Sequence, residues 1–293
     1  MFKFRRIAVA LMVFTLMLAM FNMKHTVSAD NVIDEFAGKP IIVYGSKLTD
    51  EQVEQTKRLL DSKGEDVEEL EVDGTDLAKY IGGNPNANMY SSVKIIFESK
   101  GHGITTNIVT KDNITKVTED MYKNALLTAG VEDATVEVAS PVKVTGESAL
   151  TGIYKAYDDV EDIELDTERM KVANEELELS TKLTDEGLSN EEVSNLITEI
   201  KSELGKNKGL SKEDIEGVID NKLSELNLEL KESDRQLLID LFNKMKEIDI
   251  DFNKIESQLA DITEGLKDKL DKVDTKGFFQ RIVDFFKNLF ERF

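Results

Sequence analysis

Two apolar runs decide the fold of the first half of the chain: Val93-Lys94-Ile95-Ile96-Phe97-Glu98 and Ile104-Thr105-Thr106-Asn107-Ile108-Val109-Thr110. Both are short and rich in β-branched residues, which is typical of strands. The link between them is Ser99-Lys100-Gly101-His102-Gly103, and its two glycines allow the positive φ that tight turns demand. We therefore predict that these two strands form a hairpin.

Similar runs lie on both sides of this pair. We predict further strands at residues 41–44, 67–72 and 134–138, and helices at residues 50–62, 75–81, 118–129 and 147–157. Two adjacent strands among alternating strands and helices indicate a mixed sheet with helices on at least one face. Residues 30–158 are therefore predicted to form an α+β domain.

From Val160 onward the pattern is helical almost throughout. Helices are predicted at residues 165–183, 191–204, 212–226, 234–246 and 252–273. Short links between them fit an antiparallel bundle or a stack of helical hairpins, which would occupy residues 159–275. The fold class is thus α+β, with a mixed sheet and packed helices followed by an all-α domain that ends in an amphipathic helix.

Several of these helices carry a start signal. A hydroxyl residue followed three positions later by an acid or a glutamine predicts a capping box at Ser189, Ser211 and Thr49. Ser233 with Gln236 is predicted to open the helix over residues 234–246 in the same way. This shared motif stabilises helix N-termini, and we do not interpret it as a binding site.

The start of the chain predicts export. Phe2-Lys3-Phe4-Arg5-Arg6 is a cationic segment, residues 7–21 are apolar except for Thr15, and Val27-Ser28-Ala29 supplies small residues before a cut. These features are typical of a secretory signal peptide over residues 1–29, cleaved between Ala29 and Asp30. The mature protein is then expected outside the cell, either free or associated with the outer face of the membrane or with the cell wall.

Composition excludes several classes of protein. The chain has 37 Lys and Arg against 58 Asp and Glu, for a formal charge of -21, so it would repel a phosphate backbone and nucleic-acid binding is not expected. The absence of cysteine excludes disulfides, a thiol nucleophile and cysteine-ligated metals.

Catalytic motifs fail on inspection. His102 is the sole histidine left after cleavage, and its flanking glycines predict a solvated turn instead of a general base. Gly146-Glu147-Ser148-Ala149-Leu150 lacks the second glycine of a nucleophile elbow. The Ser91-x-x-Lys94 spacing has no Lys-Thr-Gly companion, and no Gly-rich loop accompanies Tyr90 and Lys94. We assign no catalytic residue and no cofactor.

The calcium-loop mimic also fails. Asp249-Ile250-Asp251-Phe252-Asn253 opens like such a loop, but Lys254 stands where glycine is needed and Ala260 where glutamate is needed. No metal site is assigned. With so many acids, a carboxylate-dependent hydrolase acting on envelope glycan and a calcium-binding envelope protein remain alternatives.

The end of the chain, residues 276–293, is distinctive. It holds four bases and two acids, and its apolar residues recur at helical spacing, which predicts an amphipathic helix. Such a helix suits the surface of an anionic membrane, or a groove on the bundle or on a partner protein, and we favour docking. Self-association through it stays open. Eight residues form the predicted membrane- or partner-binding face: Phe278, Phe279, Ile282, Phe285, Phe286, Leu289, Phe290 and Phe293.

Three blocks carry a resemblance to a known family. They are Met121-Tyr122-Lys123-Asn124-Ala125-Leu126-Leu127-Thr128-Ala129-Gly130-Val131, Ser148-Ala149-Leu150-Thr151-Gly152-Ile153-Tyr154-Lys155-Ala156-Tyr157 and Leu241-Phe242-Asn243-Lys244-Met245-Lys246. In them the chain resembles the YpuA-like secreted proteins of Gram-positive bacteria, a domain of unknown function, although Phe252 stands where we expect a tryptophan. The resemblance implies export to the cell envelope and supplies no catalytic residues. We therefore expect a non-enzymatic interaction or membrane-surface protein.

Overall fold

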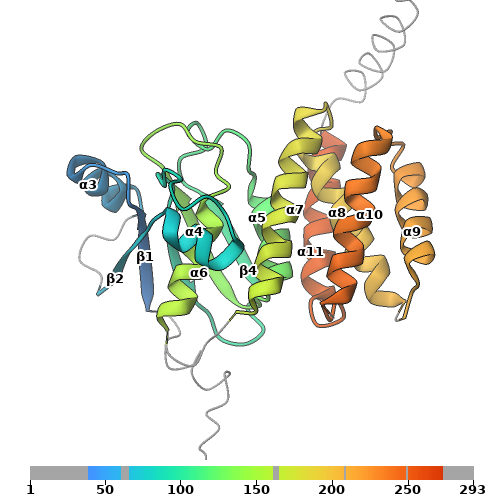
Figure 1. Ribbon diagram of the computed structural model, residues 1–293, viewed down its shortest axis with the longest axis horizontal. Coiled ribbons are helices and arrows are strands. Elements are labelled where there is room, and N and C mark those ends of the chain that lie inside the picture. Colours follow the sequence, from blue (N-terminus) through green and yellow to red (C-terminus); the bar gives the residue numbers. More distant parts are fainter. Residues whose placement is uncertain (1–38, 61–65, 161–164, 208, 249, 273–293) are drawn as a thin grey trace, which may run out of the picture.

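The structure is a computed structural model that describes residues 39–60, 66–160, 165–207, 209–248 and 250–272 (Figure 1). The predicted signal peptide and the predicted amphipathic helix at residues 276–293 lie outside these described residues. The element order is β1 (Pro40–Gly45), α3 (Asp50–Leu59), β2 (Glu68–Val72), α4 (Gly74–Ile81), β3 (Ser92–Phe97), β4 (Ile104–Ile108), α5 (Glu119–Ala129), β5 (Ala134–Ala139), α6 (Ala149–Asp159), α7 (Thr167–Asp185), α8 (Asn190–Lys206), α9 (Lys212–Glu225), α10 (Glu232–Glu247) and α11 (Glu256–Lys272). The predicted fold class, a mixed sheet with helices followed by packed helices, is confirmed.

The sheet has the strand order β2-β1-β3-β5-β4. β1 and β2 are parallel, as are β4 and β5, whereas β3 runs antiparallel to both of its neighbours, β1 and β5. Two parallel strand–helix–strand units, β1-α3-β2 and β4-α5-β5, therefore lie on either side of the single reversed strand β3.

The predicted hairpin between the third and fourth strands is wrong. β5 lies between β3 and β4, and its residues from Ala139 to Ala134 pair with β3 along its whole length. Gly101 and Gly103 do have positive φ, of 88° and 77°, and His102 is exposed between them, as expected. A glycine link permits a reversal but does not force the strands that it joins to pair, and the return of β5 after α5 takes the edge of β3 that a hairpin would have used.

Helices cover both faces of the sheet. Side chains alternate along β1, so that Ile41 and Val43 face one side while Ile42 and Tyr44 face the other, where they pack with Leu60 at the end of α3. On the first side α6 lies across β1 and β3, with α4 beside it (Figure 1). Gly152 of α6 allows this close approach, because a Cβ there would lie 3.1 Å from Val93 Cγ2.

The helix-start signals predicted from the sequence are confirmed with one exception, although α7 and α11 begin at Thr167 and Glu256, later than the predicted residues 165 and 252. The capping boxes at Ser189, Ser211 and Thr49 are all formed. α10, however, begins at Glu232 after Lys231, so Ser233 lies inside the helix and does not cap it. The backbone amide of Asp234 instead donates to the carbonyl of Lys231, which starts the helix earlier without a side-chain cap.

A single apolar cluster runs through the sheet and the bundle. It extends from strand residues such as Ile95 and Val136, through α5 and α7, to Phe242 of α10 and Leu266 of α11. α7 lies between the sheet part and the remaining helices (Figure 1), and it contacts α4, α5, α8 and α10. The domain boundary near Asp158-Asp159 stays a prediction, and the cores on its two sides are continuous.

Candidate functional site

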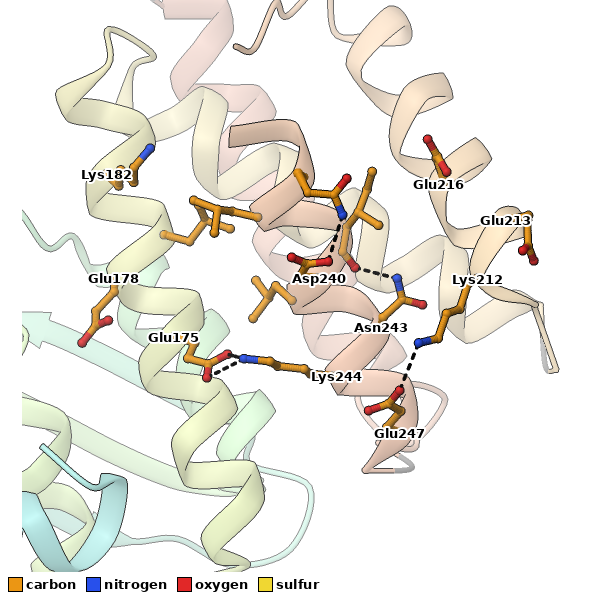
Figure 2. Close-up of a pocket in the computed structure, with 15 residues that line it drawn as sticks. Glu175, Glu178, Lys182, Lys212, Glu213, Glu216, Asp240, Asn243, Lys244 and Glu247 are labelled. Atoms are coloured by element: carbon orange, nitrogen blue, oxygen red, sulfur yellow. Dashed lines mark hydrogen bonds and ion pairs between the residues drawn. The ribbon is translucent and has the colours of Figure 1, made fainter. Parts of the chain in front are cut away.

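A charged groove of about 650 Å³ follows α10 between α7 and α9 (Figure 2). We call it the α10 groove. α7 supplies one wall, the start of α9 supplies the other, and the outer face of α10 forms the floor. It is lined by Glu175, Glu178, Leu179, Lys182, Lys212, Glu213, Glu216, Gln236, Leu237, Ile239, Asp240, Leu241, Asn243, Lys244 and Glu247.

Ion pairs hold the walls against the floor. Lys244 of α10 lies 2.7 and 2.8 Å from the two carboxylate oxygens of Glu175 on α7. On the other side Arg235 of α10 makes two 2.7 Å hydrogen bonds to Asp220 and one of 2.6 Å to Glu216, both on α9. The planar guanidinium suits this forked contact. The three helices therefore keep a defined spacing along the groove.

The groove is acidic. Six carboxylates line it against three lysines, and Glu178, Glu213 and Asp240 form no ion pair with any cation that the structure describes. A hydrogen bond from its own backbone amide, and then one from the Ser211 hydroxyl, lower the pKa of Glu213, so this side chain is ionised at neutral pH. The net negative field favours a cationic occupant.

Two further features of the floor point to an amphipathic occupant. Leu237 is a large apolar side chain, and 43% of its surface is exposed to solvent. Asn243 is only 9% exposed, and its Nδ2 donates to the Ile239 carbonyl at 2.9 Å while its Oδ1 has no partner. Figure 2 shows this amide oxygen turned toward the α9 wall beside Lys212. An unpaired buried acceptor costs about 1–3 kcal/mol, so a donor that reached it would stabilise the complex.

A second hollow, of about 670 Å³, lies where α4, the loop after it and the start of α6 meet α7. Glu147 accepts hydrogen bonds from Thr145 at 3.1 Å and from Thr181 of α7 at 3.0 Å, and Ser148 contacts Ser91 at 3.3 Å. The elbow-like Gly146–Ser148 segment thus ties α6 to α7. The Glu147 carboxylate makes this position unsuited to an anion.

The rejected serine–lysine motif is separated in space. Ser91 faces Ser148, whereas the Lys94 ammonium donates to the Leu60 carbonyl at 3.3 Å and lies 3.9 Å from Glu137. In the described part of the calcium-loop mimic, the Asp251 carboxylate accepts hydrogen bonds from the backbone and side chain of Asn253. In the described ranges no group of three or more histidine, aspartate or glutamate side chains is placed to hold a metal ion.

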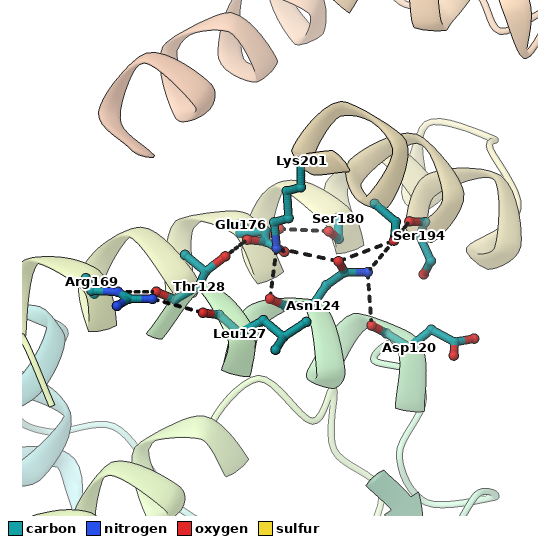
Figure 3. A network of polar contacts seen from close by, with 10 residues as sticks. Asp120, Asn124, Leu127, Thr128, Arg169, Glu176, Ser180, Ser194 and Lys201 are labelled. Atoms are coloured by element: carbon teal, nitrogen blue, oxygen red, sulfur yellow. Dashed lines mark hydrogen bonds and ion pairs between the residues drawn. The ribbon is translucent and has the colours of Figure 1, made fainter. Parts of the chain in front are cut away.

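A buried polar network joins α5 to α7 and α8, and the sequence analysis missed it (Figure 3). The Lys201 ammonium, which is 0% exposed, donates to Glu176 Oε1 at 2.7 Å and to the Asn124 carbonyl at 2.8 Å. Thr128 donates to the other oxygen of Glu176 at 2.5 Å. Burial lowers the pKa of Lys201, and the charge of Glu176 opposes that shift.

Arg169 extends this network along α7. Its guanidinium donates to the carbonyls of Thr128 and Leu127 at 2.9 and 3.1 Å, at the C-terminal end of α5. A cation at the C-terminal end of a helix also interacts favourably with the negative end of the helix dipole. One signal could have revealed the network: Lys201 follows Val193 and Ile197 at four-residue intervals, so a lysine stands on the apolar stripe of α8.

The eight predicted binding residues at positions 278–293, and Ala29 with Asp30 at the predicted cleavage site, lie outside the described residues. Within the described part, no helix is both long and apolar enough to cross a bilayer.

Comparison with known proteins confirms the resemblance seen in the sequence. A family model described as "Protein of unknown function (DUF1002)" matches residues 44–262. The chain is also similar to "Uncharacterized protein YpuA" of Bacillus subtilis (strain 168), with 41% identity over 132 residues, which are 45% of this chain and 44% of the relative. The chain thus covers less than half the length of that curated relative. No solved structure matches it.

Proposed function

The chain belongs to the DUF1002 family of proteins of unknown function, and from its own residues we propose that it is a secreted, non-enzymatic interaction protein of the cell envelope. Its interaction surface is the α10 groove, and its ligand is a basic amphipathic segment. The proposal of export is supported by the cationic and apolar stretches of residues 1–29.

One observation carries the proposal. The α10 groove combines unpaired carboxylates, the exposed side chain of Leu237 and the orphaned oxygen of Asn243 in one concavity. The carboxylates favour a positively charged ligand, Leu237 favours an apolar surface on it, and the Asn243 oxygen favours a hydrogen-bond donor. A helix with an apolar stripe and flanking lysines or arginines supplies all three, in the manner of other helix-in-groove complexes.

The test is a binding titration with a fluorescent 18-residue helical peptide of leucine and lysine, and with a matched peptide in which glutamate replaces lysine. We expect the lysine peptide to bind the full chain, with an affinity that falls as salt is added, because exposed charges are screened. Asp240→Lys should weaken that binding, whereas Glu264→Lys on an exposed part of α11 should not. Equal binding of both peptides, or of neither, would contradict the proposal.

The terminal segment is the second element of the proposal, and it contacts either protein or a membrane surface. Four bases and nine apolar side chains in residues 276–293 support an interfacial position. Flotation with anionic liposomes tests it by comparing the full chain with a chain that ends at Lys276. Flotation of the full chain alone, weakened by salt, would indicate a membrane contact, and flotation of neither would favour docking on protein.

A further inference from the structure

We propose that the α10 groove is the docking site of this chain's own terminal segment, residues 276–293. The inference rests on the proposed function, because it names the occupant of the same groove. The segment starts four residues beyond α11, which ends at Lys272. Because the segment is covalently attached to the chain, every molecule that has the groove also carries the segment.

The distribution of charge along the segment argues for this occupant. In a helix each residue advances the azimuth by about 100°, so residues eleven apart lie within about 20° of each other. Arg281 and Arg292 are eleven apart, and so are Lys276 and Lys287. These two pairs border opposite edges of the apolar stripe, which lies between them. As the predicted helix, the segment would carry two rows of bases with apolar side chains between them.

The groove has the complementary arrangement. Glu175 and Glu178 stand on the α7 wall and Glu213 and Glu216 stand on the α9 wall (Figure 2), and Leu237 of α10 also lines the groove. Glu175 and Glu216 are held by Lys244 and Arg235, whereas Glu178 and Glu213 form no ion pair with a described cation, so each wall offers one such carboxylate to a row of bases. The segment has a net charge of +2 in a chain of -21, so few other stretches could match this acidic groove.

The aromatic side chains of the segment also suit the walls. Lys182 and Lys244 line the groove beside α10, and their aliphatic stems offer apolar surface to a ring. A phenylalanine face above a lysine ammonium adds a cation–π contact. The buried oxygen of Asn243 would accept a hydrogen bond from a base that enters at the α9 side.

The experiment places a photo-crosslinking benzoylphenylalanine at Phe285 in the full chain and maps the products by mass spectrometry. We expect crosslinks to the groove-lining parts of α7, α9 and α10. The same reagent at Asp284, on the opposite side of the predicted helix, serves as the control and should give a lower yield. Products within one chain or between two copies both support the proposal, and they are separated by size on a denaturing gel.

Charge reversal supplies the second arm. The pair Glu178→Lys and Glu213→Lys should reduce the crosslink yield at least several-fold, whereas Glu264→Lys should leave it unchanged. Crosslinks that fall mainly outside the groove, or a yield that ignores the reversal, would overturn the proposal. The absence of any crosslink within protein would overturn it as well.

A third arm separates this inference from the proposed function. Arg281→Glu, Lys287→Glu and Arg292→Glu together should vacate the groove, so the leucine–lysine peptide should bind this full-length variant more tightly than it binds the unaltered chain. If the peptide binds both chains equally, the terminal segment is not the occupant although the groove still binds basic helices. If it binds neither, the proposed function itself fails.

Discussion

Lys201 and Glu176 are charges placed where solvent cannot reach them, at 0% and 1% exposure. Moving an ion out of water costs several kcal/mol even after the protein relaxes, and only a close partner with further hydrogen bonds offsets that cost. Here the ammonium has the Glu176 carboxylate and the Asn124 carbonyl, and the carboxylate also has the Thr128 hydroxyl. The pair therefore favours one arrangement of α5, α7 and α8 over other apolar packings.

The first prediction concerns the loss of one partner. Lys201→Met should destabilise the protein by about 3–5 kcal/mol, because it leaves the Glu176 carboxylate buried without a counter-charge. Urea unfolding followed by circular dichroism measures this change. The double variant Glu176→Gln with Lys201→Met should recover most of the loss, because no uncompensated charge remains.

The matched control is Lys206→Met on the same helix, where the lysine is 57% exposed beside Glu203. A surface pair of this kind contributes little, so the change in unfolding free energy should stay below about 1 kcal/mol. A double variant as unstable as Lys201→Met alone would show that lost packing, and not the orphaned charge, is responsible.

α6 shows how one residue sets the distance between an element and the sheet. Its buried face carries Ala149, Gly152, Ile153 and Ala156, and a Cβ at Gly152 would come within 3.1 Å of Val93 on β3. Small side chains at helical spacing let the helix backbone lie close to the strands. The tight packing of α6 on the sheet depends on these small side chains.

The second prediction tests that spacing. Gly152→Leu should lower the unfolding free energy by about 1–3 kcal/mol, because the added side chain forces α6 away from β1 and β3. The control is Gly217→Ala in α9, where a Cβ would meet nothing within 4 Å. That change should stabilise the protein by about 0.5–1 kcal/mol through helix propensity. Thermal melts of both variants decide the matter, and an unchanged melt for Gly152→Leu would refute the packing argument.

The sheet and the bundle depend on each other across α5. One face of α5 packs on β4 and the other on α7 and α8, so nearly every side chain from Met121 to Ala129 is buried. Without α7 and α8, the apolar side chains and the amide of Asn124 on that second face would meet water. The two predicted domains therefore share the helix that would have to seal either one.

The third prediction follows from this shared helix. A fragment of residues 30–158 should fail to fold on its own. It should show no cooperative thermal transition and only a weak near-ultraviolet circular dichroism signal. The chain of residues 30–293 should unfold in one transition, with equal calorimetric and van't Hoff enthalpies. A cooperative melt of the fragment would show instead that the boundary near Asp158 separates independent units.

Much of the candidate site was beyond reach of sequence reasoning. The sequence pattern predicted the helices that form the α10 groove, and one of the family-like blocks contains Asn243 and Lys244. It could not show that Glu175 meets Lys244, because these residues are 69 positions apart. The predicted start of α10 was also wrong, because a backbone hydrogen bond to the Lys231 carbonyl starts the helix before Ser233.

Sequence by itself determined the elements of this protein, their order and its α+β class, since caps such as Ser211 with Asp214 and the period of apolar residues act within a few positions. Tertiary structure alone decided that β5 enters between β3 and β4, that Lys201 meets Glu176 and Asn124 across 25 and 77 positions, and that α7, α9 and α10 enclose an acidic groove. The physical reason is that pairing and burial between distant segments depend on which surfaces compete for the same edge or core. Local sequence patterns do not predict which of these surfaces will pair.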